Sequence, residues 1–63
     1  MNDSEVVQDL RSKTKPYLHV NMKQSQFSNT LIRFEAGLLK PKTFILFMKR
    51  FGYFKVDGLW QKL

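Results

Sequence analysis

Two stretches near the middle of the chain decide the fold: Lys23–Gly37, which reads KQSQFSNTLIRFEAG, and Pro41–Tyr53, which reads PKTFILFMKRFGY. Only the three residues LLK separate them. In both stretches apolar side chains recur every three or four residues, the spacing that gathers them on one face of an α-helix. Gly37 suits the left-handed residue that ends a helix, and Pro41 suits the first turn of the next. The sequence therefore predicts two short helices joined by a tight turn.

The first of these helices is expected to begin near Gln24, with Asn21 or Ser25 as the residue that caps it. Ile32 lies off the apolar stripe, so we expect it to contact a neighbouring element or to be partly exposed. The predicted buried stripe follows the positions i, i+4, i+7 and i+11: Phe27, Leu31, Phe34 and Leu38.

The second helix has its stripe at i, i+3, i+4 and i+7: Phe44, Phe47, Met48 and Phe51. Ile45 and Leu46 widen its apolar face. A strand is the alternative, because residues 43–48 (TFILFM) are rich in residues that favour β-structure. The helical period and Pro41 favour the helix.

A further helix is predicted at the start of the chain, from residues 2–4 to about Ser12, with a narrow apolar stripe of Val6, Val7 and Leu10. Lys15 precedes a proline, which disfavours helix at that position. Residues 17–20 (YLHV) are β-prone, and they predict one short strand or an extended linker.

The end of the chain predicts a β-hairpin over residues 53–61, YFKVDGLWQ. Asp57-Gly58 suits a type I′ turn, which needs positive φ at both central residues. Trp60 is expected to close the core from the hairpin side. Alternation along the first strand divides four side chains between two faces: Phe54 with Val56, and Tyr53 with Lys55.

The predicted fold class is mainly α with a C-terminal β-hairpin: three short helices in a helix-turn-helix or winged-helix-like order, as one domain over residues 1–63. This length is close to the lower limit for a domain without disulfides or metals. The domain is therefore expected to be marginally stable alone, and dimerisation through an aromatic surface would stabilise it. The predicted core has nine members: Val6, Leu10, Phe27, Leu31, Phe34, Phe44, Phe47, Phe51 and Trp60.

Charge is distributed unevenly along the chain. The formal net charge is +6, yet residues 1–10 carry −3 and residues 11–63 carry +9. Such a field attracts polyanions, of which nucleic acid is the commonest for a small protein. The chain has no cysteine, which excludes disulfides and thiolate metal sites. The longest apolar run has five residues, far below the ~20 that span a bilayer, so we expect a cytoplasmic protein.

Residues 25–52 resemble the second half of a Cro/repressor-type helix-turn-helix domain. In that family a Glu-x-Gly signature often ends the recognition helix, and a basic stretch, a proline and another amphipathic helix follow. The matching letters here are RFEAG at residues 33–37, KPK at residues 40–42, and the amphipathic segment to Gly52. The DGLW at residues 57–60 is similar to the tail of small Cro-like proteins. The resemblance implies a DNA-binding domain.

The family also places a complete first helix and a turn before the recognition helix, starting from a Thr/Ser-Gln pair. Residues 23–26 (KQSQ) have that character but lie too close to Glu35 for both elements. Either the first helix of the pair is residues 4–13, across an unusual linker, or the domain is a winged helix. Residues 54–57 with Trp60 are similar to the helix-to-wing junction of heat-shock-factor-type winged helices. The two alternatives assign base reading to different helices.

Polar side chains on one face of the first central helix are of the types that hydrogen-bond base edges. Asn and Gln pair with adenine, Arg pairs with guanine, and a major-groove reader presents such residues on one helix face. An ordinary solvated helix face is the alternative. The predicted DNA contacts on this helix and at its start are Lys23, Gln24, Ser25, Gln26, Asn29, Thr30 and Arg33.

Basic residues around that helix are predicted to contact phosphates, which position a protein without specifying sequence. The alternative for each is a surface residue that serves solubility. These predicted phosphate contacts are Lys40, Lys42, Lys49, Arg50 and Lys55.

The aromatic residues offer another use, the stacking of unpaired bases, with Tyr53, Phe54 and Trp60 the candidates for exposure. Their spacing argues that most belong to the core. His19 is the only histidine and has no clustered ligands nearby, so no metal site or cofactor is expected. Because no nucleophile–base arrangement, paired carboxylates or Gly-rich phosphate loop is present, no enzyme is expected.

The sequence thus predicts a small regulator of double-stranded DNA, a repressor or a recombination accessory factor of phage or plasmid type that binds as a dimer. The main alternative is a basic interaction protein that modulates an acidic protein partner. Residues 40–55 also form a basic amphipathic stretch that suits a membrane surface. The acidic start of the chain and the hairpin argue against that use, and no membrane partner is expected.

Overall fold

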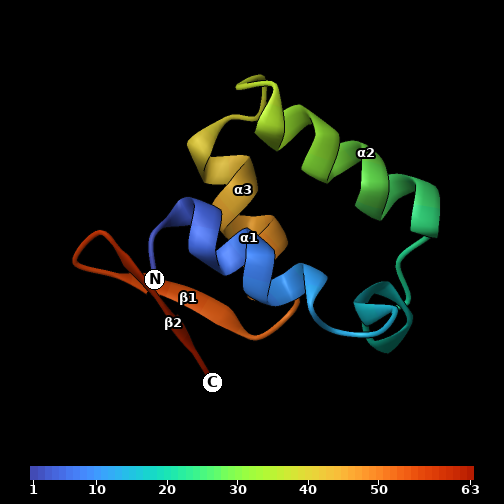
Figure 1. The fold of residues 1–63 in the computed structure, drawn as a ribbon, viewed down its shortest axis with the longest axis horizontal. Helices are drawn as coiled ribbons and strands as arrows, with labels where there is room; N and C mark the ends of the chain where they lie inside the picture. Colours follow the sequence, from blue (N-terminus) through green and yellow to red (C-terminus); the bar gives the residue numbers. More distant parts are fainter.

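The computed structural model describes all 63 residues and contains three α-helices, one 3₁₀-helix and a two-stranded antiparallel sheet (Figure 1). The predicted class, mainly helical with a C-terminal hairpin, is confirmed. None of the helices combines the length and apolar character needed to cross a membrane. The elements are α1 (Asp3–Arg11), η1 (Pro16–Val20), α2 (Gln24–Glu35), α3 (Pro41–Lys49), β1 (Tyr53–Val56) and β2 (Leu59–Lys62).

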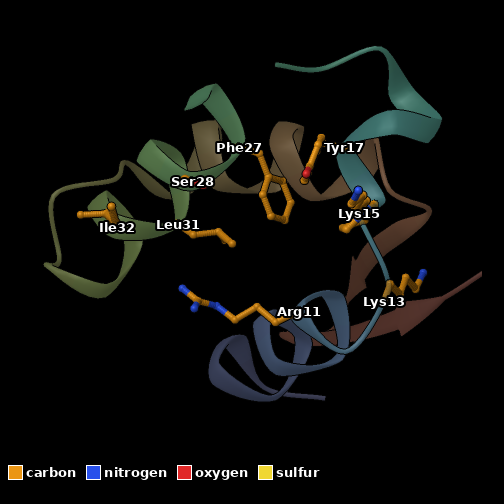
Figure 2. A pocket seen from close by; sticks show the side chains of 9 residues that line it. Arg11, Lys13, Lys15, Tyr17, Phe27, Ser28, Leu31 and Ile32 are labelled. Carbon is orange, nitrogen blue, oxygen red and sulfur yellow. The ribbon is translucent and has the colours of Figure 1, made fainter. Parts of the chain in front are cut away.

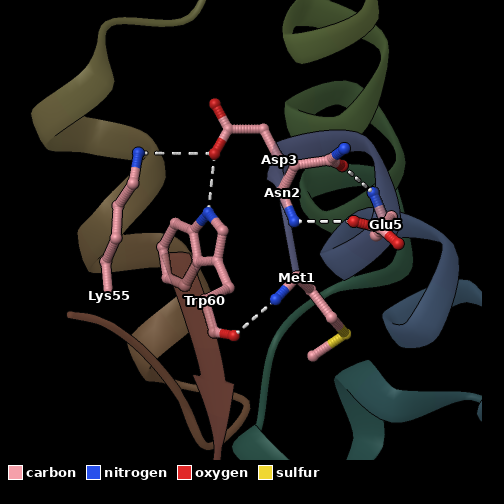
Figure 3. Close-up of polar contacts among 6 residues, drawn as sticks. All are labelled: Met1, Asn2, Asp3, Glu5, Lys55 and Trp60. Atoms are coloured by element: carbon pink, nitrogen blue, oxygen red, sulfur yellow. Dashed lines mark hydrogen bonds and ion pairs between the residues drawn. The ribbon is translucent and has the colours of Figure 1, made fainter. Parts of the chain in front are cut away.

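The first helix, α1, begins with a capping box. The Asn2 side chain accepts a hydrogen bond from the Glu5 amide, and the Glu5 carboxylate accepts one from the Asn2 amide (Figure 3). Each bond satisfies an amide that the helix itself leaves without a partner. The predicted stripe of Val6, Val7 and Leu10 is buried.

Residues 17–20 form neither the strand nor the extended linker that the sequence predicts, because they belong to the 3₁₀-helix η1. Lys15 and Asn21 flank it with φ of +47° and +54°, and these left-handed residues reverse the chain at both ends. The Met22 amide donates to the Tyr17 carbonyl at 3.0 Å. The Tyr17 ring packs on Phe27 of α2, 5.4 Å from ring centre to ring centre, so this segment lies against α2 and does not join the hairpin.

The second helix, α2, spans Gln24–Glu35, and Gly37 has the predicted left-handed conformation with φ of +73°. The predicted caps were wrong, because Lys23 is the N-cap residue and its side chain makes no capping bond. The predicted buried stripe was wrong at Leu38, which is 75% exposed. The left-handed residue turns the chain before Leu38, which therefore leaves the helical stripe.

The third helix, α3, begins at Pro41 as predicted and buries Phe44, Phe47 and Met48. Its predicted helical state is confirmed over the strand alternative. Phe44 is the contact point of α3 with its neighbours, because its ring stacks on Phe34 of α2 at 4.5 Å and meets the Trp60 indole edge-on at 5.3 Å.

The hairpin turn has φ of +52° at Asp57 and +80° at Gly58, and Val56 pairs with Leu59 across it. The two-residue turn is therefore confirmed. Tyr53 and Trp60 are each only 1% exposed. These two aromatic rings, predicted as candidates for base stacking, lie instead in the core, while Trp60 closes the core as predicted.

Eleven side chains form the core: Val6, Val7, Leu10, Met22, Phe27, Leu31, Phe44, Phe47, Met48, Tyr53 and Trp60. Two predicted members, Phe34 and Phe51, are only partly buried against it. The nine-member core predicted from the sequence omitted four of the eleven, namely Met22, Tyr53 and two residues of the predicted helix stripes, Val7 and Met48. Met22 follows the unforeseen η1, and Tyr53 belongs to the strand face that α1 covers.

Two carboxylates of α1 hold the hairpin. Asp3 accepts a hydrogen bond from the Trp60 indole at 2.6 Å and forms an ion pair with Lys55 at 3.4 Å (Figure 3). Asp9 accepts a hydrogen bond from the Tyr53 hydroxyl and forms an ion pair with Lys62 at 3.3 Å. The polar ends of both buried aromatic side chains are thus satisfied by the same helix.

The hydrogen bond between Tyr53 and Asp9 shifts the pKa of both side chains. The Tyr53 hydroxyl lowers the pKa of Asp9, partial desolvation opposes this, and Lys62 and Lys13 lower it further. Burial, and then the bond to Asp9, raise the pKa of Tyr53. Because the folded pKa of Asp9 is depressed, its contribution to stability is complete above its unfolded pKa of about 4 and is lost as the pH falls through the folded value.

We expect Tyr53→Phe to lower the thermal midpoint at pH 7 and to flatten the loss of stability between about pH 4 and pH 2. The variant keeps the buried ring but removes the donor that depresses the pKa of Asp9. Thermal unfolding followed by circular dichroism across this range measures both effects. Tyr17→Phe is the matched control, since Tyr17 is a half-buried tyrosine whose hydroxyl makes no hydrogen bond within the protein. An unchanged pH slope in Tyr53→Phe would contradict the assignment.

Candidate nucleic-acid interface

Four of the polar residues predicted on α2 lie together in one shallow hollow. Gln26, Asn29, Thr30 and Arg33 line it from α2, and Leu39 and Thr43 line it from the turn and α3. Gln24 and Ser25 are exposed in the first turn of α2, outside this hollow. The hollow towards α3 therefore brings together four of the polar residues predicted on α2 and leaves out the two in its first turn.

A second hollow continues the first along the same side of α2. It shares Gln26, Thr30 and Thr43 with the first and extends to Leu46 and Arg50 of α3. We call this combined surface the α2–α3 groove. Thr43 and Leu46 were not predicted as site residues, because their place beside α2 depends on how the two helices pack and not on a pattern within either one.

Three predicted site residues already make bonds within the protein: Thr30, Arg50 and Lys55. The Thr30 hydroxyl donates to the Gln26 carbonyl at 2.8 Å, the usual local bond of a threonine in a helix. The Arg50 guanidinium donates to the Val20 carbonyl at 3.1 Å and so ties α3 to the end of η1. Thr30 can therefore only accept from a ligand, while Arg50 keeps further donors.

Four of the five acidic residues are committed to bonds within the protein. Asp3 and Asp9 bind the hairpin, Glu35 pairs with Arg11, and Glu5 completes the capping box. Asp57 lies at the tip of the hairpin, in its turn. The pairing with Asp3 removes Lys55 from the set of free cations, and the hairpin holds it away from the α2–α3 groove.

The basic residues of α2, α3 and the turn between them have no acidic partner. They make no ion pair and are exposed: Lys23, Arg33, Lys40, Lys42 and Lys49. Cations without local partners are the ones that can neutralise phosphates on a bound polyanion. The predicted phosphate contacts other than Lys55 thus remain available, and they concentrate around α2 and α3.

Lysine occupies the N-cap position of both central helices. Lys23 of α2 and Lys40 of α3 make no side-chain capping bond, and neither helix has an acidic residue in its first turn. Unpaired amides and the helix dipole make such ends positive. The twelve residues of α2 extend about 18 Å. Positive groups therefore lie at the start of α2 and, through Lys40 and Lys42, just beyond its end.

The segment before α2 contains a helix and a turn of its own. The 3₁₀-helix η1 ends at Val20, the three residues 21–23 form the turn, and α2 follows. Asn21 makes the sharp change of direction in a left-handed conformation. A short helix, a three-residue turn and a longer helix with a polar outer face are thus consecutive in the chain.

Comparison of the chain with protein-family models, curated proteins and solved structures finds no match. No group of three or more His, Asp or Glu side chains is arranged to hold a metal ion. Function is therefore inferred from the α2–α3 groove and the charges around it.

We expect Lys23→Ser to stabilise the protein by about 1 kcal/mol, because a serine at the N-cap can accept a hydrogen bond from the Gln26 amide. For a domain of this size, that corresponds to about 4–8 °C in thermal midpoint. Urea unfolding measures the change in free energy. Lys23→Ala is the control that removes the charge without providing a cap. A Lys23→Ser variant no more stable than Lys23→Ala would show that this helix end needs no cap.

Proposed function

We propose that the protein is a small DNA-binding regulator of the helix-turn-helix class, with the polar outer face of α2 in the major groove. The observation that carries this proposal is the α2–α3 groove itself. Gln26, Asn29 and Arg33 lie on one exposed helix face, and the basic residues around them have no acidic partner. Asn and Gln match the edge of adenine, and Arg matches that of guanine.

The order of elements supports α2 as the helix that reads bases. In a helix-turn-helix the second helix enters the groove and the first crosses the backbone. Here η1, the turn at residues 21–23 and α2 have that order, and the resemblance to Cro/repressor domains assigns the same role to the helix that ends in EAG. α3 is less suited to readout, because its apolar side chains are turned into the core and its outer face carries Leu46, 56% exposed.

Phosphate contacts would come from both ends of α2. Lys23 lies at its start, and Lys40 and Lys42 lie at the start of α3, just after it. These lysines stand beside helix amides without capping bonds, an arrangement that favours phosphate oxygens. Arg50 lines the groove just after the end of α3, and Lys49 is the exposed basic residue next to it in the chain. The local cost in helix stability at the two uncapped ends is understandable if phosphate binds there.

The proposed regulator is a repressor or an architectural factor that acts by binding rather than by catalysis, in the cytoplasm. Dimeric binding would double the contacts on a site with two-fold symmetry. Such a dimer would use aliphatic rather than aromatic surface, because the most exposed large apolar residues are aliphatic: Leu18, Ile32, Leu38, Leu46, Val56, Leu59 and Leu63.

The test begins with selection of a preferred duplex from a random pool, followed by fluorescence anisotropy across a salt series. We expect Arg33→Ala to cost about 1–3 kcal/mol on that duplex and to relax the preference at one position. Lys42→Gln should weaken binding to all duplexes alike and reduce the salt slope by about one. Gln8→Ala, a change of an exposed polar residue on α1, is the control and should leave binding unchanged.

Two outcomes would refute DNA binding through α2. One is an affinity that does not fall with salt, since phosphate contacts release counterions. The other is a preferred duplex that Arg33→Ala and an Asn29→Ala variant bind as well as the unchanged protein.

A second candidate is an interaction protein that binds an acidic protein partner on the same groove. The exposed Leu46 beside Arg50 favours it, because base readout has no need of a large aliphatic side chain there. This function predicts a one-to-one complex with a purified acidic partner that survives nuclease treatment and is weakened by Leu46→Gln. DNA binding predicts that Leu46→Gln leaves the affinity for duplex DNA unchanged.

A further inference from the structure

A separate hollow, apart from the α2–α3 groove, lies on the other side of α2, between this helix and the end of α1 (Figure 2). Its volume is about 400 Å³, and it shares no residue with the α2–α3 groove. We call it the α1–α2 cleft. Its apolar part consists of Pro16, Tyr17, Phe27, Leu31 and Ile32, and Ser28 opens onto it from α2.

The apolar wall of the cleft is fixed by its own packing. The Phe27 ring is 5.4 Å from the Tyr17 ring and 5.5 Å from the Phe51 ring, centre to centre, so it is held from two sides. Leu31 is buried beside it, and Pro16 is buried at the start of η1. A ligand that covers this wall would remove apolar surface from water without first moving a core side chain.

Three basic residues border the same cleft: Arg11, Lys13 and Lys15. Lys15 is exposed and makes no ion pair. Arg11 pairs with Glu35, but a guanidinium has five donors and this contact uses one nitrogen. The Lys13 ammonium lies over the Tyr53 ring, 4.8 Å from its centre. Lys13 therefore contributes mainly its aliphatic stem to the border of the cleft. The border therefore has an excess of positive charge beside an apolar wall.

We infer that the α1–α2 cleft binds a small organic anion, with its apolar body against Phe27 and Leu31 and its acidic group at Lys15 and Arg11. The volume lies in the range of small-molecule sites, which are mostly apolar with a few charged groups that fix orientation. The positive border selects an anion over a neutral molecule of the same shape. This inference does not depend on DNA binding, since the cleft and the groove have no residue in common.

The consequence for α2 is that one helix would contact two ligands on two faces. Ser28, Leu31 and Ile32 face the cleft, while Gln26, Asn29 and Arg33 face the groove. An anion in the cleft would touch α2 and the end of α1 together, where the Arg11–Glu35 ion pair joins them. If α2 reads DNA, such an anion is placed to act as an effector.

The experiment compares two probes on the full chain. The first is 8-anilinonaphthalene-1-sulfonate, which has an aromatic body and a sulfonate. The second, N-phenyl-1-naphthylamine, has the same body and no charge. Fluorescence titration gives both dissociation constants, and ¹H–¹⁵N spectra locate the site. We expect the anionic probe to bind about tenfold tighter, as one added charge contact implies, and to shift the amides of Tyr17, Phe27 and Ser28.

Substitutions at the exposed Ser28 test the role of charge without touching the core. Ser28→Glu and Ser28→Gln add side chains of nearly the same size, so the difference between them isolates the effect of charge. We expect the anionic probe to bind Ser28→Glu about tenfold more weakly than Ser28→Gln, and the neutral probe to bind the two variants equally. Lys15→Gln should also weaken the anionic probe, whereas Lys42→Gln, a change on α3 away from the cleft, should not. The dispersion of the amide spectra shows that each variant remains folded.

Several results would overturn the inference. Equal affinity for the two probes would indicate an apolar surface that docks a neutral partner segment. Amide shifts confined to the α2–α3 groove or to the hairpin would place the anion elsewhere. Equal binding by Ser28→Glu and Ser28→Gln would exclude the cleft as the site of the acidic group. None of these outcomes bears on DNA binding, which the salt series tests separately.

Discussion

The attachment of the C-terminal hairpin to α1 through two carboxylates is the interaction on which the rest of the structure depends. Asp3 receives the Trp60 indole, and Asp9 receives the Tyr53 hydroxyl. Each bond lets a large aromatic side chain be buried without leaving a polar atom unpaired, which would cost more than the bond itself contributes. With Trp60 fixed, Phe44 of α3 has a surface to pack on, and through Phe44 so has Phe34 of α2. The hairpin, α3 and α2 are thus joined through one series of aromatic contacts.

The same attachment arranges the charge of the molecule. Asp3 and Asp9 neutralise Lys55 and Lys62 at the hairpin, and Glu35 neutralises Arg11. Most of the basic residues without an ion pair lie on or beside α2 and α3, while Lys13 and Lys15 lie between α1 and η1. Both central helices also begin with lysine where a capping side chain would be more stable. Only α1 has a side chain that caps its first turn, because Lys15 makes no capping bond at the start of η1 either.

Local sequence signals were sufficient for the helices and the hairpin. The periodic stripes, Gly37, Pro41 and Asp57-Gly58 each act over a few residues, so their effect is visible without the fold. They were insufficient for residues 16–20, where β-prone side chains form a 3₁₀-helix that packs on α2 through Tyr17. The same limit applies to the site. The polar face of α2 follows from its period, but Thr43 and Leu46 of the groove, and the whole α1–α2 cleft, follow from how helices pack.

The bond between Asp3 and Trp60 joins residues 57 positions apart in the sequence. Until Trp60 has been synthesised, α1 lacks the partner for its first carboxylate and α3 lacks the surface that covers Phe44. Closing so long a loop also has an entropic cost that only the complete core offsets. The fixed arrangement of the helices therefore depends on a contact made across 57 positions of the sequence. The helices emerge first but acquire that arrangement only once Trp60 is present.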